Sequence, residues 1–255
     1  MERAEETGDT VVPGPPVAPV PRTGGRQVIP RPPAAVAGGP APWAALDPRR
    51  RRGLTVDRVR RALSVDRNPP PWAQRVPADA FPDPGSPSAV LAVLFDEDGE
   101  ARVVLTRRSA HLRSHRGEVS FPGGRLEGHE TPEQGALREA SEEIGLDPGP
   151  VEVVGRLSDV TTLASGSFIT PVVGLLPARP ALVASPQEVE HVFDVTLAEL
   201  ADPGIFREEW WSVAGRAPAL GGAPFPVWFF ELPDDTVWGA TARMLVDLLR
   251  LLLDV

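Results

Sequence analysis

The chain has 255 residues, of which 42% are hydrophobic, and a formal net charge of -9 at pH 7. This length allows one good-sized core with flanking segments, and the acidic balance argues against general nucleic-acid binding, which requires a basic surface. No cysteine is present, which excludes disulfides, thiolate metal ligands and a thiol nucleophile. All 26 basic residues are arginine, which excludes a lysine-based mechanism.

The N-terminal end of the sequence lacks the marks of a secretory signal, because residues 1–10 are acidic and have no apolar core. No run approaches the roughly 18 apolar residues of a membrane span. We therefore expect a soluble, cytoplasmic protein that binds neither membranes nor nucleic acid. The number of subunits stays open, with a homodimer as one option.

Two segments are expected to precede the main domain. Residues 1–40 are rich in Pro, Gly and Ala without a helical or strand period, which predicts a disordered arm. Residues 41–87 predict one or two short helices with a basic face, followed by a Pro-rich irregular connection. A basic face can contact an anion or a membrane surface, but arginine runs are more often a solvated face. The main domain is expected to span residues 88–255.

Within the main domain, apolar runs and alternation predict a sheet with a helix on each face. Strands are expected at 88–95, 102–107, 119–121, 151–157, 168–176 and 226–232, the first two forming a hairpin. The stretch 188–201 begins with either a short helix or a strand. Residues 236–255 repeat apolar residues at helical spacing, which predicts a C-terminal helix packed on the sheet. The expected fold class is α/β, an α/β/α sandwich with a mixed sheet.

A second helix is predicted just after the turn Pro122-Gly123-Gly124. Thr131 is a good N-cap, Pro132 suits the first helical position, and Gln134 completes a capping box. Gly145 should end the helix, because glycine adopts the left-handed conformation of a C-terminal cap without a steric penalty.

Carboxylates line one side of this helix at fixed spacing. Glu139, Glu142 and Glu143 fall on a stripe more exposed than the apolar side, and like charges so close repel one another. A divalent cation removes the repulsion, and Mg²⁺ is commonly shared between carboxylates and substrate phosphates. Arg138 can pair with Glu130 and the other acidic residues. The competing interpretation is a solvated acidic helix face.

Arginines gather in the sequence just before the helix. Planar guanidinium groups bind phosphate oxygens through two parallel hydrogen bonds, so this cluster suits a phosphorylated substrate. The competing interpretation is that some of them only pair with the glutamates. We assign substrate binding to Arg107, Arg108, Arg113, Gly123 and Gly124.

Residues 124–146, GRLEGHETPEQGALREASEEIGL, resemble a complete Nudix box, the signature of hydrolases that cleave a nucleoside diphosphate linked to another moiety. Ala140 stands where the family has a bulky aliphatic residue, and every charged position is intact. The resemblance implies the Nudix fold with its catalytic loop-helix-loop and Mg²⁺ or Mn²⁺ as cofactor. It also implies Glu139, Glu142 and Glu143 as metal ligands, supported by Glu130 and Arg138.

The segment 104–124 resembles the signature of coenzyme A (CoA) diphosphatases within the Nudix group. Further phrases like that family's occur at 161–174, 185–193 and 237–245. The resemblance implies hydrolysis of CoA or its thioesters to 3′,5′-ADP and 4′-phosphopantetheine or its acyl derivative. The matching positions are Leu105, Thr106, Arg108, Ser109, Arg113, Gly117, Phe121, Pro122, Gly123 and Gly124, with Val104 for a leucine.

The resemblance implies catalytic roles for Glu139, Glu143 and Glu188. The general base is Glu139 as first choice, or a glutamate of a later loop, where Glu188 and Glu190 are available. A second hypothesis keeps the fold but takes ADP-ribose, a dinucleotide or a nucleoside triphosphate as substrate. A third is a non-catalytic Nudix-fold binding module, which is disfavoured because that class usually loses box glutamates.

Overall fold

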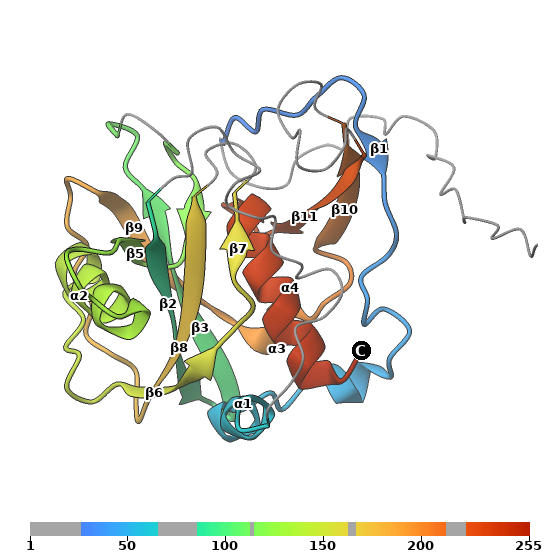
Figure 1. The fold of residues 1–255 in the computed structure, drawn as a ribbon. Helices are drawn as coiled ribbons and strands as arrows, with labels where there is room; N and C mark the ends of the chain where they lie inside the picture. The colour runs from blue at the N-terminus through green and yellow to red at the C-terminus, as the bar shows by residue number, and fades with distance from the viewer. Residues whose placement is uncertain (1–26, 66–85, 113–114, 163–166, 213–222) are drawn as a thin grey trace, which may run out of the picture.

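Two β-sheets lie on either side of one long helix in the computed structural model (Figure 1). The structure describes residues 27–65, 86–112, 115–162, 167–212 and 223–255. Helix α4 (Gly239–Leu253) lies between the sheets, and α2 (Pro132–Ile144) covers the outer face of the larger sheet. No helix of the described ranges is long and apolar enough to cross a membrane.

The larger sheet contains the predicted hairpin at its centre. Its path runs β4-β3-β2-β8-β6, and β5, β7 and β9 pair with β2, β8 and β3. The β2–β8 pairing is parallel and the others are antiparallel, which confirms the mixed sheet. The strands are β2 (Ser88–Glu97), β3 (Glu100–Arg108), β4 (Val119–Ser120), β5 (Gly123–Arg125), β6 (Glu152–Arg156), β7 (Val160–Thr161), β8 (Phe168–Leu176) and β9 (Val189–Thr196).

Both faces of β2 are buried, which explains why its sequence is a continuous apolar run rather than an alternation of apolar and polar residues. Successive side chains point to opposite faces of a strand, so β2 contributes to two separate cores. On the α2 side lie Ala89, Leu91, Val93 and Phe95, and on the α4 side lie Ala92 and Leu94.

The smaller sheet was not predicted as a separate unit. Its order is β1-β10-β11-β12, all antiparallel, with bounds Val36–Ala37, Phe206–Trp211, Phe225–Glu231 and Thr236–Trp238. The prediction of a helix from residue 236 is wrong at its start, because Thr236–Trp238 pairs with β11 and α4 begins at Gly239. Gly239 has a φ of 64°, a turn that separates strand from helix.

Residues 27–40 do not form the predicted disordered arm. They include β1, and they bury Ile29 and Ala35 against the smaller sheet. The segment is short and irregular, so its residues show no helical or strand period. Residues 1–26 lie outside the described residues. Trp43 follows and is fully buried, with its ring against Phe206 and Phe230 at centroid distances of 5.4 and 6.3 Å.

The expected short helices are confirmed as a 3₁₀ turn at Pro48–Arg51 and α1 at Val56–Leu63. Two arginines of this basic segment, Arg50 and Arg58, donate hydrogen bonds to the C-terminal carbonyls of α4, Leu253 and Leu252. Positive charge stabilises a helix C-terminus, so these two arginines serve packing within the fold. The undecided stretch 188–201 consists of β9 followed by the short helix α3 (Leu197–Leu200).

Candidate active site

Helix α2 begins and ends as its sequence predicts. Thr131 Oγ1 accepts a hydrogen bond from the Gln134 amide at 3.3 Å, and Gln134 Oε1 accepts one from the Thr131 amide at 2.9 Å. The capping box is therefore complete. Gly145 ends the helix with a φ of 63°. These caps fix where the helix starts, and so which residues face the sheet.

Three carboxylates meet at the edge of the larger sheet. Glu139 and Glu143 come from α2 and Glu188 from the residue just before β9, and oxygens of all three lie within 4.8 Å of one another. The Ser109 amide at the end of β3 donates to the Glu188 carbonyl at 2.8 Å. Ser109 belongs to the segment that resembles the CoA diphosphatase signature, so this segment positions the third carboxylate through its backbone.

Glu143 is buried, with a residue exposure of 2%, which corrects its expected place on an exposed stripe. Its Oε2 accepts a hydrogen bond from the Gly123 amide at 3.0 Å, and its Oε1 lies 3.5 Å from Arg108 Nη1. Burial raises the pKa of Glu143 to about 7, with neighbouring Glu139 and Glu188 adding to the effect, although Gly123 and Arg108 oppose it. A cation at this position would offset the cost of the buried charge.

Glu139 lies one turn earlier, largely buried against the glycine turn. Its Oε1 accepts a hydrogen bond from Arg138 Nη1 at 3.0 Å, and burial raises its pKa. A Cβ on Gly124 would lie 2.5 Å from the Glu139 carboxyl carbon, and one on Gly123 would lie 2.4 Å from the Ala89 carbonyl oxygen. A side chain at either position would clash, because Gly123 lies against strand β2 and Gly124 lies against the Glu139 carboxylate.

Glu142 does not belong to the group of three carboxylates. Its side chain is 59% exposed and pairs with Arg138 Nη1 at 3.1 Å. Arg138 also pairs with Glu130 at 2.8 Å and with Glu139, which confirms the expected pairing of this arginine with several acids. Arg138 lowers the pKa of Glu130 to about 2. The role of Glu142 as a metal ligand stays a prediction.

The predicted phosphate-binding arginines lie in different surroundings. Arg108 lies against Glu143, and its buried Nε has no hydrogen-bond partner within the described part of the chain. Arg107 instead donates from Nε to Asp235 Oδ1 at 2.7 Å, so it ties β3 to the turn before β12. Arg113 falls outside the described residues. Glu190, the other candidate base, is outside the three-carboxylate group and acts electrostatically on Arg107.

The donor set of Glu139, Glu143 and Glu188 fits a hard divalent cation. All three donors are carboxylate oxygens, which Mg²⁺ and Mn²⁺ accept as ligands. Three carboxylates this close repel one another, and the raised pKa values of Glu139 and Glu143 include that repulsion. The fit rests on the chemistry and convergence of these side chains.

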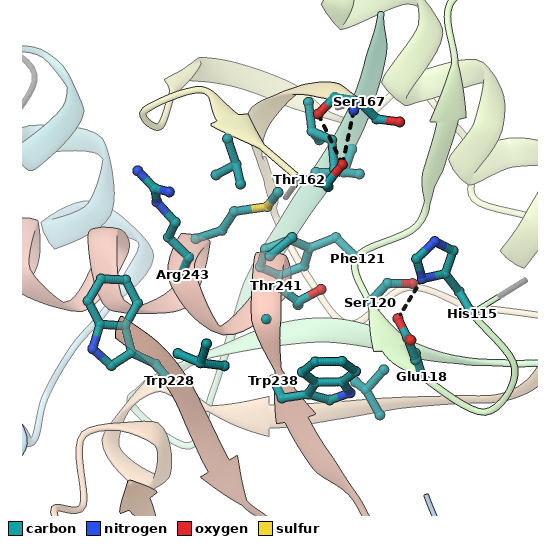
Figure 2. A pocket seen from close by; sticks show the side chains of 18 of the residues that line it. His115, Glu118, Ser120, Phe121, Thr162, Ser167, Trp228, Trp238, Thr241 and Arg243 are labelled. Atoms are coloured by element: carbon teal, nitrogen blue, oxygen red, sulfur yellow. Dashed lines mark hydrogen bonds and ion pairs between the residues drawn. The ribbon is translucent and has the colours of Figure 1, made fainter. Parts of the chain in front are cut away.

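A pocket of about 520 Å³ opens beside the carboxylates, and residues of both sheets line it. Figure 2 shows it from close by, with Phe121, Trp228 and Trp238 among its lining side chains. Arg108, Gly123 and Gly124 line it and also contact or adjoin the carboxylates, so the pocket begins at the cluster. The far wall comes from the smaller sheet and the start of α4, and no sequence motif connects these residues with the site. Its aromatic members are Trp211, Phe225, Trp228 and Trp238.

The chain matches the NUDIX domain family over residues 85–215. It is 36% identical over 193 residues to Nudix hydrolase 3 of Caenorhabditis elegans, covering 69% of this chain and 80% of that protein. It is 37% identical over 147 residues to the Escherichia coli protein described as uncharacterized Nudix hydrolase NudL, covering 57% and 72%. The solved structure of the Nudix hydrolase RenU of M. smegmatis has a TM-score of 0.40 at 26% identity, covering 46% of this chain and 74% of that chain.

Proposed function

Because the chain belongs to the Nudix hydrolase family, we propose that it hydrolyses the diphosphate bond of CoA or its thioesters. The products are 3′,5′-ADP and 4′-phosphopantetheine or its acyl derivative. In this reaction one P–O bond of the diphosphate breaks, the oxygen of a water forms a new bond to phosphorus, and the proton of that water passes to a base.

The residues of the carboxylate cluster would hold Mg²⁺ or Mn²⁺ through Glu139, Glu143 and Glu188. When bound, such an ion neutralises diphosphate charge and lowers the pKa of water. Glu142, on the exposed side of α2, can join as a ligand by exchanging its bond with Arg138. Arg108 binds a phosphate oxygen, because it reaches the cluster and its Nε has no partner in the described ranges.

Glu139 and Glu188 are the two candidates for the base that accepts the water proton. Burial raises the pKa of Glu139, but one of its carboxylate oxygens is already occupied by a hydrogen bond from Arg138 at 3.0 Å. Glu188 is exposed, and its carboxylate accepts no side-chain hydrogen bond from the described residues. We therefore assign the proton to a Glu188 carboxylate oxygen, with Glu139 as the alternative.

The choice of CoA rests on one observation, the convergence of the two sequence motifs. Arg108 and Ser109 come from the segment that resembles the CoA diphosphatase signature, and both contact residues of the carboxylate cluster. Arg108 approaches Glu143, and Ser109 fixes the backbone of Glu188. These two contacts of signature residues with the cluster support the assignment of the diphosphate to this place.

Mass spectrometry of products tests the proposal. Full-length protein incubated with CoA and Mg²⁺ should yield 3′,5′-ADP and 4′-phosphopantetheine, and omission of Mg²⁺ with a chelator present should abolish both. ADP-ribose, a dinucleotide and a nucleoside triphosphate serve as comparison substrates at equal concentration. Faster cleavage of any of these than of CoA would contradict the assignment of substrate.

A further inference from the structure

The pocket beside the carboxylates is lined mainly by carbon. Its far wall includes aromatic rings from the smaller sheet, two of which, Trp228 and Trp238, are labelled in Figure 2. Val90, Ile169 and Met244 add aliphatic surface. The indole N–H groups of Trp211 and Trp228 donate to Glu209 at 2.7 Å and to Glu208 at 2.7 Å. Since these donors are already used, the two tryptophans offer the pocket apolar ring surface.

Most polar side chains around the pocket bond to other protein groups. His115 Nδ1 lies 2.9 Å from Glu118 Oε2, and the Ser167 amide donates to Thr162 Oγ1 at 3.0 Å, as Figure 2 shows. A purine base needs several donors and acceptors along its edges, and these side chains are engaged elsewhere. The pocket therefore suits a ligand with few hydrogen-bonding groups.

Thr161 on β7 differs from these bonded side chains. It is 8% exposed, it lines the pocket, and its buried Oγ1 has no hydrogen-bond partner in the described ranges. A buried hydroxyl without a partner costs free energy, which is recovered when the Thr161 side chain turns its Oγ1 toward a ligand group and bonds to it. One hydroxyl in an apolar wall matches an alkyl chain that carries an amide.

Two charged residues bear on which half of the substrate enters. Arg243 of α4 lines the pocket, and Asp247, one turn further on, acts on it electrostatically. Arg108 at the mouth lies against Glu143. Arg108 is assigned to the diphosphate at the cluster, and Arg243 already has Asp247 nearby. A bisphosphorylated nucleoside inside the pocket would place its second phosphate among aromatic rings, which is unfavourable.

The N-terminal segment closes one side of the pocket. Pro30 and Pro32 line it, and Arg31 between them donates from Nε to buried Glu209 at 2.8 Å. Gln27 Oε1 accepts a hydrogen bond from the Thr236 amide at 2.6 Å. These contacts hold the segment against the smaller sheet, so the pocket walls include residues from well outside the 85–215 family match.

We propose that this pocket is the subsite for the pantetheine arm of the substrate, with any acyl group it carries, and that the adenosine half lies outside it. The arm is uncharged, largely aliphatic and contains amides, one of which bonds to Thr161 Oγ1. This assignment rests on the proposed function, because it takes CoA as the substrate whose diphosphate lies at the carboxylate cluster.

Calorimetric titration of the two reaction products into the full-length protein with Mg²⁺ tests the assignment. Ala240 lines the pocket from the first turn of α4, so Ala240→Leu should narrow the pocket and lower the affinity for 4′-phosphopantetheine at least about tenfold through a direct clash. Thr161→Val should lower this affinity about two- to tenfold, and Thr161→Ser should restore it. Binding of 3′,5′-ADP should change in neither variant. Ala62→Leu on α1, a half-buried alanine away from the pocket, is the matched control.

Unchanged 4′-phosphopantetheine affinity in both pocket variants, or no binding of this product to the wild type, would overturn the assignment. A selective loss of 3′,5′-ADP would instead put the adenosine half in the pocket. Hydrolysis of intact CoA is assayed separately with each variant. If the wild type cleaves CoA but the pocket variants lose affinity for 3′,5′-ADP instead of 4′-phosphopantetheine, only the subsite assignment is wrong. If the wild type does not cleave CoA, the proposed function itself is refuted.

Discussion

The carboxylate cluster is held mainly by contacts between residues near one another in the sequence, whereas the far wall of the pocket is held by contacts between residues far apart. The bond from the Gly123 amide to Glu143 joins residues 20 apart, whereas Gln27 and Thr236 are 209 apart, and Arg31 and Glu209 are 178 apart. The cluster follows a helix whose caps and spacing are local. The wall depends on strand pairings that no local pattern specifies, so the two regions should respond differently to mutation.

Removing a carboxylate from the cluster should have the largest effect on activity. Glu143→Gln or Glu139→Gln removes a ligand charge, which contributes several kcal/mol to transition-state stabilisation. Turnover at saturating Mg²⁺ should fall by about 10²- to 10⁴-fold. Glu133→Gln, in the first turn of the same helix and paired with Arg156, is the control and should keep nearly full turnover. Near-native rates for both cluster variants would contradict the assignment of Glu139 and Glu143 as metal ligands.

Gly124→Ala tests the close approach between the glycine turn and the cluster. The new Cβ would lie 2.5 Å from the Glu139 carboxyl carbon, so this side chain must move. A shift of about 1 Å in a catalytic group can cost up to about 100-fold, and we expect kcat to fall by that order. Gly39→Ala, whose Cβ would meet only Glu208 Oε1, at 4.0 Å, is the matched control. Equal kcat values in the two variants would contradict the prediction that catalysis depends on the close approach of Gly124 to Glu139.

Arg108→Ala should raise KM for CoA more than it lowers kcat, because it removes one charge-assisted contact to phosphate. The expected loss in kcat/KM is about 10- to 100-fold, or roughly 1.5–3 kcal/mol. Arg107→Ala is the informative comparison, since Arg107 pairs with Asp235 and should mainly lower the melting temperature. A similar rise in KM for Arg107→Ala would support the original prediction that Arg107 binds the substrate.

The smallest effect is expected from a substitution in the wall of the pocket, and it should appear as a loss of folding stability. Arg31→Ala removes one partner of buried Glu209, which keeps bonds from Arg207 and Trp211. We expect a loss of about 1–2 kcal/mol, seen as a fall in Tm of about 2–8 °C.

Arg60→Ala is the control for Arg31→Ala. It breaks exposed pairs with Asp57 and Glu152, and such surface pairs are worth at most about 1 kcal/mol. Identical Tm values for the two variants would mean that residues 27–40 add nothing to the packing of the smaller sheet.

Much of the cluster could be predicted because its signals are local. Thr131, Gln134 and Gly145 define the ends of α2, and the glutamate spacing places Glu139 and Glu143 on adjacent turns. Family resemblance then supplied Glu188, 45 residues after Glu143, since no helical or strand period connects the two. The burial of Glu143 was missed, because helical spacing alone does not show that the Gly123 strand packs over its carboxylate.

The central hairpin, the capped helix α2, most of the C-terminal helix and the acid chemistry of the cluster could be predicted from the sequence, because each depends on residues near one another in the chain. Three features came only from the folded chain: the pairing of Val36–Ala37 with β10, the strand at Thr236–Trp238, and the contact of Arg107 with Asp235. Antiparallel pairing leaves the same alternation in a sequence whichever partner a strand takes. The partner, and with it the pocket, is fixed by which distant apolar faces bury each other.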